Sequence, residues 1–587
     1  MLVKKTKIVC TLGPASDQKD VLKQLVKNGL NVARLNFSHG NHEEQGKRIE
    51  TIKEVREELN VPIAVLLDTK GPEIRTGKFK DPEVVLQEGQ IFTITTREVL
   101  GDSTICSVSY TGLALDVKEG DSILIDDGLI ELKVQKISNG TDIECIVQNT
   151  GIVKNHKGVN VPGVKINLPA ITEKDEGDIL FGINMDIDFI AASFVRKAED
   201  VLAIRKILEE NNAQHIQIIS KIENQEGVDN LDEIIEVSDG IMVARGDLGV
   251  EIPTEEIPLV QKLMIEKCNK AGKPVITATQ MLDSMIRNPR PTRAEVTDVA
   301  NAILDGTDAI MLSGETAAGK YPVEAVKTMT NIAKRTEESI NYRELLRNRA
   351  IAKETTITDA ISNATCVTAM DLQASAIITA TSSGHTARMV SKFRPKASII
   401  ATTTQERVRR RLSLIWGVYS VLTEELQSTD DIIEISVQKA LEEKMIQRGE
   451  LIVITAGVPV GVAGTTNLIK AHIVGNILLS GTGIGKKPAT GKVVVIDATQ
   501  PNNKEVQEGD ILVTQFTDKD LMPYIELAGA IVTEEGGFTS HAAIVGLNLG
   551  KPTIVGAELA TTKLKDGDLV TVDANTGLIY SGKTRVL

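Results

Sequence analysis

The sequence, 587 residues long, predicts an α/β protein of several domains built mainly on parallel sheets. The first reason is length, which suggests roughly three to five domains. The second is that short apolar segments rich in Val, Ile, Leu and Ala alternate with amphipathic helical segments, as in sheets buried on both faces. The third is composition: 42% of the residues are apolar and 25% are charged, which is typical of globular proteins.

Between residue 6 and about 340, eight segments have the pattern of buried strands. They are KIVCT (7–11), VARLNF (32–37), AVLLD (64–68), FIAASF (189–194), IQIISKI (216–222), GIMVA (240–244), PVITA (274–278) and AIMLS (309–313). Helical segments such as 43–59 and 199–212 lie between most of them. Eight such strands with crossover helices predict a closed, parallel (β/α)₈ TIM barrel.

The rest of the chain predicts three further units. The gap between the third and fourth strands is too long for one helix, and its alternating pattern with Gly/Asp turns indicates an inserted β domain. Strands and helices alternate again later, as in an open α/β sheet, before a final β-rich unit. We therefore expect a barrel in 1–71 and 169–345, an inserted β lid in 72–168, an α/β domain in 355–473 and a C-terminal β/α domain in 474–587, with GTGIGKKPATG (481–491) as a linker.

Charge and composition exclude several classes of function. The net charge of −14 argues against a nucleic-acid or anionic membrane partner, because both need a basic surface. The five cysteines are scattered and never form C-x-x-C, which fits a reducing cytoplasm and no structural zinc. No apolar run approaches the roughly 18 residues of a membrane helix. We expect a soluble cytoplasmic protein.

Polar residues gather where the predicted strands end. In a (β/α)₈ barrel the carboxyl ends of the strands form the site. Six strands place polar residues there: Arg34, Asn36, Ser38 and His39; Asp68, Thr69 and Arg75; Lys221 and Glu223; Arg245, Gly246 and Asp247; Thr277, Thr279 and Gln280; Ser313 and Glu315. Any one of them alone is better explained as a cap or turn residue. Six strands together indicate a site.

The residue types at these positions favour phosphoryl transfer. Glu223 and Asp247 offer hard oxygen ligands suited to Mg²⁺. The cations Arg34, Arg75 and Lys221 suit phosphate oxygens, whose charge must be neutralised from several sides. Lys221 and Glu223 stand two positions apart at the end of one strand, so they leave on the same face. We expect both to act on one phosphoryl group, Lys221 directly and Glu223 through the metal.

Several strings in this region closely resemble the pyruvate kinase family. They are NVARLNFSHG (31–40), LLDTKGPEIR (66–75), ISKIENQEG (219–227), VARGDLGVE (243–251), TATQMLDSM (277–285) and MLSGETAAGKYP (311–322). Their order and the position of the insertion also match. The resemblance implies transfer of the phosphoryl group of phosphoenolpyruvate to ADP, the last step of glycolysis, followed by protonation of the enolate to pyruvate.

The resemblance also implies a role for each matching barrel residue. Arg34 would bind the phosphate of phosphoenolpyruvate, and Lys221 would stabilise the transferring group. Glu223 and Asp247 would ligate Mg²⁺ or Mn²⁺, Asp247 lying against the substrate. Gly246 and Thr279 would contact the substrate carboxylate, with Thr279 in the proton relay to the enolate.

Further implied roles concern K⁺ and the nucleotide. The K⁺ ligands would be Asn36, Ser38, Asp68 and the carbonyl of Thr69. Glu73 resembles the acidic variant of K⁺-dependent members, so we expect a K⁺ requirement. Arg75 and Lys157 would bind the nucleotide phosphates as the inserted domain closes like a lid.

Three other motifs are better explained as structural. GETAAGKY (314–321) nearly matches a phosphate-binding loop, but Tyr321 replaces the hydroxyl that should ligate Mg²⁺. TRAE (292–295) fits a helix capping box. The basic run RVRRR (407–411) is predicted to be a solvated helix face.

An allosteric site is expected at TSSGHTAR (381–388), which joins a strand to a helix. Helix N-termini of this kind bind phosphate, and pyruvate kinases place an effector pocket here. The expected residues are Thr381, Ser382, Ser383, Gly384, His385 and Thr386. The alternative is a capped helix with no ligand. The loop GVPVGVAGTTN (457–467) lacks the Trp and Arg that animal enzymes use for a second phosphate, which favours AMP or ribose 5-phosphate over fructose 1,6-bisphosphate. A homotetramer is the family's assembly.

The segment TEEGGFTSHAAIVGLNLGKPTIVG (533–556) resembles the swivelling phosphohistidine domain of phosphoenolpyruvate-utilising enzymes. His541 occupies the phosphorylated position. The arginine that usually follows six residues later is Leu547 here, and no ATP-grasp domain accompanies it. A nucleophile needs its charge partners. We therefore favour a domain kept for packing or regulation over a phosphate-carrying His541.

Two other functions fit parts of the pattern. A metal-dependent lyase on a barrel also handles pyruvate enolate, but it does not explain the closing β domain, Arg75 with Lys157, or the K⁺-type cluster. A catalytically dead sugar-phosphate sensor would not need the full charged site.

Overall fold

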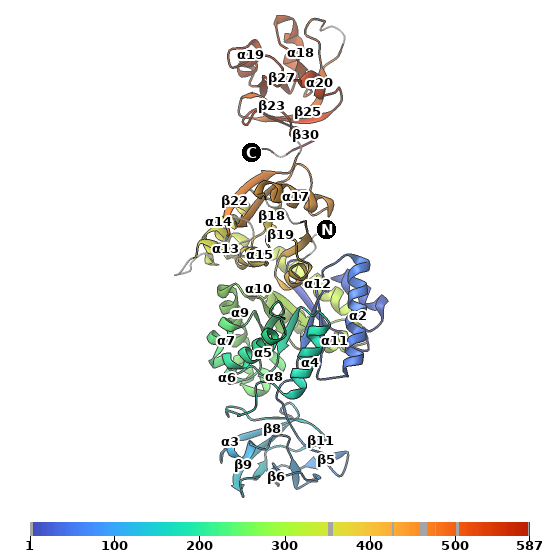
Figure 1. The fold of residues 1–587 in the computed structure, drawn as a ribbon, viewed down its shortest axis with the longest axis vertical. Helices are drawn as coiled ribbons and strands as arrows, with labels where there is room; N and C mark the ends of the chain where they lie inside the picture. The colour runs from blue at the N-terminus through green and yellow to red at the C-terminus, as the bar shows by residue number, and fades with distance from the viewer. Residues whose placement is uncertain are drawn as a thin grey trace.

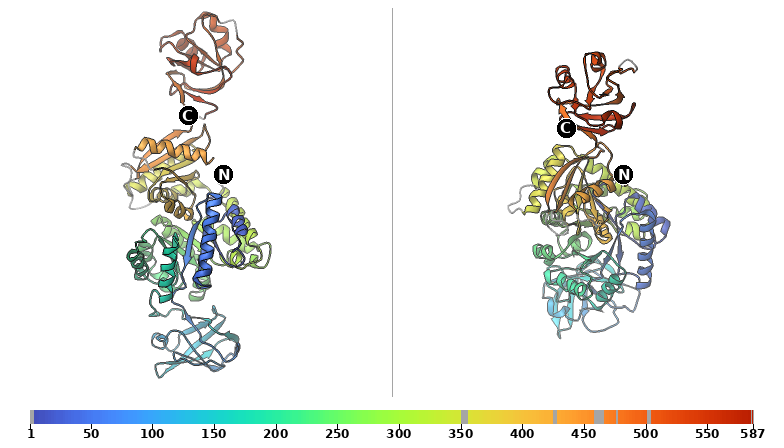
Figure 2. Two further views of the ribbon diagram at one scale, coloured as in Figure 1. Left: turned by 45° about the vertical axis from the view of Figure 1, so that its right-hand side comes forward. Right: turned by 45° about the horizontal axis from the view of Figure 1, so that its top comes forward.

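The computed structural model describes residues 4–349, 356–424, 428–457, 466–475, 477–500, 504–584 and 586. It is elongated, with four units arranged along one axis (Figures 1 and 2). The inserted β sheet lies at one end, followed by the barrel, the α/β sheet and the C-terminal unit at the other end (Figure 1). Over the described residues no helix is both long enough and apolar enough to cross a bilayer.

A closed parallel barrel of eight strands confirms the predicted fold class. Its strands are β1 (Lys7–Thr11), β2 (Val32–Asn36), β3 (Ala64–Asp68), β13 (Phe189–Ala192), β14 (Gln217–Ile222), β15 (Gly240–Ala244), β16 (Val275–Ala278) and β17 (Ala309–Leu312). Each expected strand is present, but five end or begin one or two residues inside the expected range. Polar residues such as Ser193 and Ser313 fall outside the strands because the chain turns into the next helix there.

Helices cover the outside of the barrel and bury its apolar strand residues. They are α1 (Lys19–Asn28), α2 (His42–Leu59), α4 (Glu173–Asn184), α5 (Ala198–Glu210), α6 (Gln225–Asp229), α7 (Leu231–Val237), α8 (Arg245–Glu251), η1 (Thr254–Glu256), α9 (Ile257–Ala271), η2 (Asp283–Ile286), α10 (Arg293–Asp305), α11 (Gly314–Ala317) and α12 (Pro322–Ser339). The Thr292–Glu295 capping box at the start of α10 is present as predicted. Pro322 begins α12, so GETAAGKY makes a helix start here.

The segment between β3 and β13 forms a separate β unit with its own apolar core. Its elements are β4 (Ile74–Arg75), β5 (Glu83–Leu86), β6 (Ile91–Thr95), β7 (Ile105–Ser107), α3 (Leu113–Asp116), β8 (Ser122–Ile125), β9 (Ile130–Ser138), β10 (Asp142–Val147), β11 (Gly151–Lys154) and β12 (Gly158–Asn160). Seven strands pair in the order β4-β12-β8-β9-β10-β6-β7, and β11 pairs with β5. This unit lies below α8 and α4 in Figure 1, at the carboxyl end of the barrel strands.

A five-stranded sheet lies at the opposite end of the barrel, in the order β20-β19-β18-β21-β22. Its elements are α13 (Tyr342–Arg349), α14 (Ile357–Asp371), β18 (Ala376–Ala380), α15 (His385–Lys392), β19 (Ser398–Thr403), α16 (Glu406–Arg411), η3 (Leu412–Leu414), β20 (Val418–Leu422), α17 (Thr429–Glu442), β21 (Leu451–Gly457) and β22 (Thr466–Ile473). Its strands are parallel except β22.

The basic run of α16 corrects one prediction. All four of its arginines bond to the barrel, and of the four only Arg407 is also exposed to solvent. Arg407 pairs with Asp186, and Arg410 with both Asp186 and Asp188. Arg409 donates to the carbonyl of Asn60, and Arg411 to that of His215. The run is basic because it faces acidic and carbonyl groups of the barrel, a partner surface that composition alone cannot reveal.

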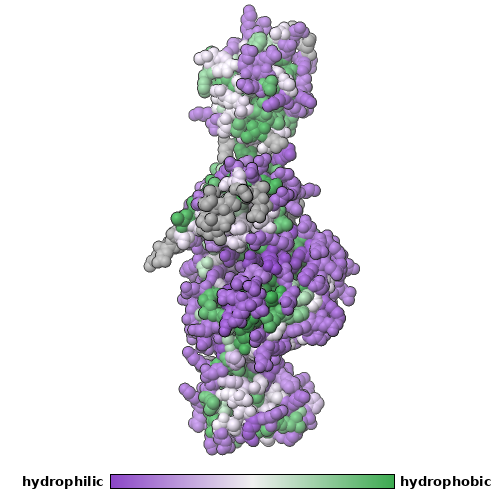
Figure 3. All heavy atoms as spheres, viewed as in Figure 1, coloured by the Kyte–Doolittle hydropathy of each residue, from purple (hydrophilic) through white to green (hydrophobic). Residues whose placement is uncertain are grey.

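The C-terminal unit is an eight-stranded sheet in the order β23-β30-β29-β25-β26-β27-β28-β24. Its elements are β23 (Ile477–Ser480), β24 (Thr482–Ile484), β25 (Pro488–Val495), β26 (Ile511–Thr514), η5 (Lys519–Leu521), α18 (Met522–Leu527), β27 (Ala530–Thr533), α19 (His541–Leu549), β28 (Thr553–Val555), α20 (Ala560–Lys563), β29 (Leu569–Asp573) and β30 (Leu578–Ser581). Figure 3 shows mostly hydrophilic residues over the barrel and green patches near the base of this unit.

The expected linker 481–491 is wrong, because these residues supply β24 and much of β25. Its glycines serve close packing. A Cβ on Gly483 would lie 2.1 Å from the carbonyl oxygen of Ala574, and one on Gly491 would lie 2.2 Å from that of Gly509. Glycine therefore marks close backbone approach here, not flexibility.

Candidate active site

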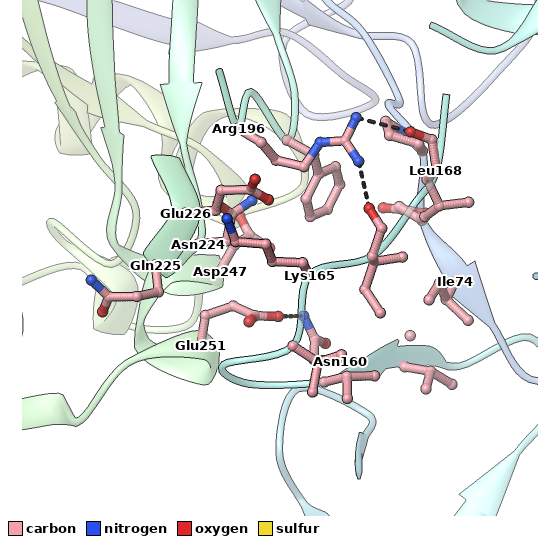
Figure 4. Close-up of a pocket in the computed structure, with 18 of the residues that line it drawn as sticks. Ile74, Asn160, Lys165, Leu168, Arg196, Asn224, Gln225, Glu226, Asp247 and Glu251 are labelled. Atoms are coloured by element: carbon pink, nitrogen blue, oxygen red, sulfur yellow. Dashed lines mark hydrogen bonds between the residues drawn. The ribbon is translucent and has the colours of Figure 1, made fainter. Parts of the chain in front are cut away.

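The candidate site lies between the carboxyl ends of the barrel strands and the inserted β unit. A cavity of about 340 Å³ opens there. The inserted unit lines it with Arg75, Asp126, Asp127 and Lys157, and the barrel lines it with Asn224, Asp247 and Glu251 (Figure 4). Two contacts hold the walls together. Asn160 Nδ2 donates to Glu251 Oε1 at 2.7 Å, and the guanidinium of Arg196 donates to the carbonyls of Ile166 and Leu168 (Figure 4).

Lys221 is the centre of a buried charged cluster beside this cavity. Its Nζ lies 3.0 Å from Asp68 Oδ1, 2.9 Å from Glu223 Oε1 and 2.8 Å from Ser193 Oγ. Burial disfavours the charged ammonium, but the carboxylates of Asp68 and Glu223 outweigh it and raise the pKa of Lys221 above its ordinary value. Lys221 is therefore a permanent cation.

Arg34 binds the other carboxylate oxygen of Asp68, the one that Lys221 does not contact. Its Nε lies 2.6 Å from Asp68 Oδ2, and its Nη1 donates to Thr11 Oγ1 at 2.8 Å. Burial alone would raise the pKa of Asp68, but Arg34 and Lys221 lower it below its ordinary value. Asp68, on β3, thus stays ionised and holds together one cation from the neighbouring strand β2 and one from β14, two strands away.

Glu223 and Asp247 are the expected divalent-metal ligands. Strand β14 includes Lys221 but ends at Ile222, so Glu223 is the first residue after the strand. The carboxylate of Glu223 nevertheless contacts Lys221, as expected for two side chains on the same face. Its Oε2 accepts a bond from Phe194 N at 2.6 Å. Burial raises the pKa of Glu223, with the charge of Asp247 adding to the effect and Lys221 opposing it. The two carboxylates are therefore close enough to repel each other.

The donor set fits a hard cation only in part. Among the described residues no group of three or more His, Cys, Asp or Glu side chains is placed to hold a metal. A cation at Glu223 and Asp247 would take its other ligands from water or a bound substrate, as Mg²⁺ commonly does. The raised pKa of the buried Glu223 suits that arrangement, since a bound cation would replace the proton on this carboxyl.

The four expected K⁺ ligands lie at the ends of β2 and β3. Asn36 Oδ1 accepts from the backbone N–H of Ser38 at 3.0 Å, and the carbonyl of Thr69 accepts from Ser193 Oγ at 2.6 Å. The side-chain oxygens of Asp68 are taken by Arg34 and Lys221. These oxygens retain free lone pairs, because a carbonyl or carboxylate oxygen accepts more than one bond.

Thr279 and Gly246 lie against each other at the ends of β16 and β15. A Cβ on Gly246 would lie 2.6 Å from Thr279 Cγ2, so only glycine fits. Thr279 itself has a φ of 71°, a left-handed conformation that is strained for a β-branched residue. Arg245 holds this turn: its Nη2 donates to the carbonyl of Thr279 at 2.7 Å. A strained residue held by its surroundings is typical of a functional position.

Arg75 and Lys157, the expected nucleotide ligands, both face the cavity from the inserted unit. Arg75 Nε donates to Glu73 Oε2 at 2.7 Å, and its Nη1 donates to the carbonyl of His156 at 2.8 Å. Lys157 Nζ pairs with Asp126 Oδ1 at 2.8 Å. Glu73 is therefore an ion-pair partner of Arg75 in this structure.

Ser193 is a site residue that the sequence analysis missed. Its hydroxyl accepts from Lys221, donates to the carbonyl of Thr69, and lies 3.3 Å from Asp68 Oδ1. The segment 189–194 was predicted to be strand throughout, which hid the serine. The rule that located the other residues, a polar side chain just after a buried strand, identifies Ser193 once β13 ends at Ala192.

Glu315 and Ser313 form hydrogen bonds that stabilise the local backbone. Glu315 is buried, and its two oxygens accept from the N–H groups of Leu282 (3.0 Å) and Ser313 (2.8 Å). Glu315 thus joins the loops that follow β16 and β17.

The expected effector loop is tightly turned at the end of β18. Gly384 has a φ of 85°, and its N–H donates to Thr381 Oγ1 at 2.9 Å. The hydroxyls of Thr386 and Thr466 lie 2.9 Å apart. Ser382 and Ser383 lie in the turn, and His385 begins α15. In the neighbouring loop GVPVGVAGTTN, residues 458–465 lie outside the described residues.

His541 begins α19 and is exposed. Its Nδ1 lies 2.9 Å from Thr517 Oγ1, which fixes the ring. Leu547, at the position of the missing arginine, is 66% exposed on the same helix.

Comparison with known proteins gives consistent results along the chain. Residues 3–326 match the family model for the pyruvate kinase barrel domain, 359–472 that for the pyruvate kinase alpha/beta domain, and 506–577 that for the mobile domain of PEP-utilising enzymes. The chain is 58% identical to a pyruvate kinase of Geobacillus stearothermophilus over 585 residues and 57% identical to one of Bacillus licheniformis over 586, with 100% of each chain covered. A solved pyruvate kinase from Cryptosporidium parvum matches with a TM-score of 0.77 and 43% identity, over 80% of this chain and 96% of that one.

Proposed function

The chain belongs to the pyruvate kinase family and transfers the phosphoryl group of phosphoenolpyruvate to ADP, and we propose that the cluster around Lys221 performs this transfer. The observation that carries the proposal is the convergence of Arg34, Asp68 and Lys221 from three strands, with Glu223 beside Lys221, around one buried point. The lyase and the dead sensor, which the sequence left as alternatives, lose their basis with this membership.

Arg34 and Lys221 bind the phosphoryl group in this proposal. Both are buried cations now balanced by Asp68. A phosphoryl group entering the cluster gives them a second anionic partner without moving them into water. Because the pKa of Lys221 is raised, it acts as a fixed positive charge and not as a base. Such preorganised charge is the main source of catalysis in phosphoryl transfer.

Glu223 and Asp247 would hold the divalent cation, Mg²⁺ or Mn²⁺. When bound, that cation supplies positive charge to the phosphoryl oxygens. Gly246 and Thr279 would bind the substrate carboxylate, and the Thr279 hydroxyl would pass a proton to the enolate. The close contact between these two residues fixes the position of that hydroxyl.

Arg75 and Lys157 would bind the nucleotide phosphates from the inserted unit. In the structure each is paired with a carboxylate, Glu73 or Asp126, which the nucleotide phosphates would replace. We place this lid in 72–168 and the catalytic barrel in 1–71 and 169–345. K⁺ would bind Asn36, Ser38, Asp68 and Thr69, and we expect activity to depend on it.

Regulation is proposed for the other two units. A phosphorylated effector, AMP or ribose 5-phosphate, would bind Thr381–Thr386 in the α/β domain, 355–473. The domain 474–587 would serve packing or regulation without carrying phosphate on His541. We further propose a cytoplasmic homotetramer.

Lys221→Met tests the proposal. Formation of pyruvate from phosphoenolpyruvate, ADP, Mg²⁺ and K⁺ should fall by at least about 1,000-fold, because the charge nearest the phosphoryl group is lost. Mn²⁺ binding, followed by electron paramagnetic resonance, should persist because Glu223 and Asp247 remain. Lys270→Met, at an exposed position on α9, is the matched control and should keep full activity. A Lys221→Met protein that retains turnover would remove Lys221 from its role.

A further inference from the structure

The residues that follow β13 lie directly against the carboxyl end of β14. The two strands are parallel neighbours in the barrel, so the chain that leaves β13 passes Lys221 and Glu223. Lys221 Nζ donates to Ser193 Oγ at 2.8 Å, and the N–H of Phe194 donates to Glu223 Oε2 at 2.6 Å. Two consecutive residues of this turn therefore contact the two residues to which we assign the phosphoryl group and the metal.

This turn has a strained backbone that close packing holds in place. Phe194 has a φ of 55°, a left-handed conformation that is rare for an aromatic residue. Gly71 packs against the turn, and a Cβ there would lie 2.8 Å from Ser193 Cβ and 2.8 Å from Phe194 Cδ2. A strained conformation persists only where its surroundings determine it. The packing thus fixes the directions of the Ser193 hydroxyl and of the Phe194 N–H.

The ammonium of Lys221 has three N–H groups, which match the three acceptors around it. These are Asp68 Oδ1 at 3.0 Å, Glu223 Oε1 at 2.9 Å and Ser193 Oγ at 2.8 Å. Two of the acceptors are carboxylates, and within the described residues the hydroxyl of Ser193 is the one neutral partner. A neutral acceptor orients the ammonium without cancelling its positive charge.

The Ser193 hydroxyl is itself held in one orientation. Its side chain is buried, and its single O–H lies 2.6 Å from the carbonyl oxygen of Thr69 but 3.3 Å from Asp68 Oδ1. The backbone N–H of Ser193 donates to Thr69 Oγ1 at 3.1 Å, which ties the two residues together a second time. Because the O–H is engaged with Thr69, a lone pair of the oxygen is left for Lys221.

We propose that Ser193 is a positioning residue, whose hydroxyl holds the ammonium of Lys221 at the point where the phosphoryl group is transferred. The inference rests on the role proposed for Lys221 above. In that role Lys221 gives one N–H to the phosphoryl group and must release one of its present acceptors. Glu223 is the acceptor that it can release, since that carboxylate would then bind the divalent cation. Ser193 and Asp68 keep the ammonium in place during the transfer.

Ser193→Ala tests this role in steady-state assays of pyruvate formation. We expect kcat to fall about tenfold, as for the loss of a hydrogen bond to a charged group, and the KM for phosphoenolpyruvate to change by less than about threefold. Ser193→Cys should be as slow as Ser193→Ala, because a thiol fills the space but is a weak acceptor.

Ser220→Ala is the matched control. Ser220 is a buried serine next to Lys221 on β14, but it points to the opposite face of the strand, where its hydroxyl lies 2.6 Å from that of Ser238. The same deletion of a buried hydroxyl at this position should leave kcat unchanged.

A second assay separates the proton step from phosphoryl transfer. Exchange of the methyl protons of pyruvate for deuterium in D₂O, with Mg²⁺ and K⁺ present, is followed by proton NMR. It depends on Thr279 in the proposed function and transfers no phosphoryl group. Ser193→Ala should keep the exchange rate within about twofold of the wild type, because only the position of Lys221 has changed. General damage to the site would lower both rates together.

The outcomes separate this inference from the proposed function. Equal kcat values for Ser193→Ala and Ser220→Ala would overturn it, and so would recovery of kcat in Ser193→Cys, which would assign the effect to packing. Equal losses of transfer and exchange would show that Ser193 does not act through Lys221. Full turnover in Lys221→Met would instead remove the proposed role of Lys221. An inactive Lys221→Met beside a fully active Ser193→Ala would leave that role standing and remove only the role of Ser193.

Discussion

Gly246 and Thr279 pack directly against each other in the candidate active site, where a Cβ on Gly246 would lie 2.6 Å from Thr279 Cγ2. Thr279 keeps a left-handed backbone because Arg245 holds its carbonyl and Gly246 leaves room for its methyl group. The position of the Thr279 hydroxyl therefore depends on one missing Cβ. Catalysis depends on such placement, since small displacements of a catalytic group are costly.

Gly246→Ala should lower kcat by about 100-fold or more, because the new Cβ forces Thr279 away from the enolate. Gly249→Ala in the same helix is the matched control, since its Cβ would meet only the end of the Ile257 side chain, at 3.0 Å. Steady-state assays of both variants, with circular dichroism to check folding, provide the measurement. Equal activity of the two alanine variants would show that the Gly246–Thr279 contact has no catalytic role.

For single residues, the sequence predicts which side chains lie in the candidate site but not which of them pair with one another. The rule that polar residues follow buried strands places Arg34, Asp68, Lys221 and Glu223 together, and the structure has them in one cluster. It could not show that Asp68 bridges Arg34 and Lys221, because that depends on which strands are neighbours. Ser193 was missed since an apolar run that ends in Ser-Phe gives no sign of where its strand stops.

Among the elements, α16 couples the α/β domain to the barrel. Arg410 is 6% exposed and pairs with Asp188 at 2.7 Å, and Asp188 in turn accepts from the backbone N–H of Val65 in β3. A buried pair of this kind tolerates the loss of neither partner. Arg407, three residues earlier, pairs with Asp186 at the surface, where both side chains are largely exposed.

Arg410→Met should therefore lower the free energy of unfolding by about 3 kcal/mol or more, because the buried Asp188 keeps only the weaker pairing with Arg56, 3.9 Å away. Arg407→Met, the matched control, should lower it by under about 1 kcal/mol. Urea titrations followed by tryptophan fluorescence measure both, since Trp416 lies at this junction. Equal losses would mean that α16 does not anchor the domains through Arg410.

Element positions are well predicted where periodicity is strong, as in the eight barrel strands and the capping box of α10. Prediction fails where an element's role depends on a distant partner. The arginines of α16 were assigned to solvent, and the glycines of β24 and β25 to a linker. In both cases the deciding contact comes from residues far away in the chain.

In the whole molecule, the barrel lies between the inserted β unit and the α/β domain (Figures 1 and 2). The lid covers the carboxyl ends of the barrel strands, whereas the α/β and C-terminal units extend from the other end. Sequence gives the order of these units, but only the structure shows that α19, with His541, lies at the far end of the axis from the lid (Figure 1).

His541 should consequently carry no phosphate during turnover. Incubation with phosphoenolpyruvate labelled on phosphorus should leave no acid-labile label on the chain, because His541 lacks a cationic partner at Leu547 and lies far from the active site. Label that survives in a His472→Ala control and disappears in His541→Ala would contradict this.

We propose that Glu223 and Asp247 together bind one divalent cation beside Lys221. A crystal grown with Mn²⁺ and oxalate, a mimic of the pyruvate enolate, tests it most directly through the anomalous signal of the metal. We expect one ion with an oxygen of each carboxylate at roughly 2.0–2.3 Å and with Lys221 facing the oxalate. An ion held by only one of the two carboxylates, or bound elsewhere, would contradict it.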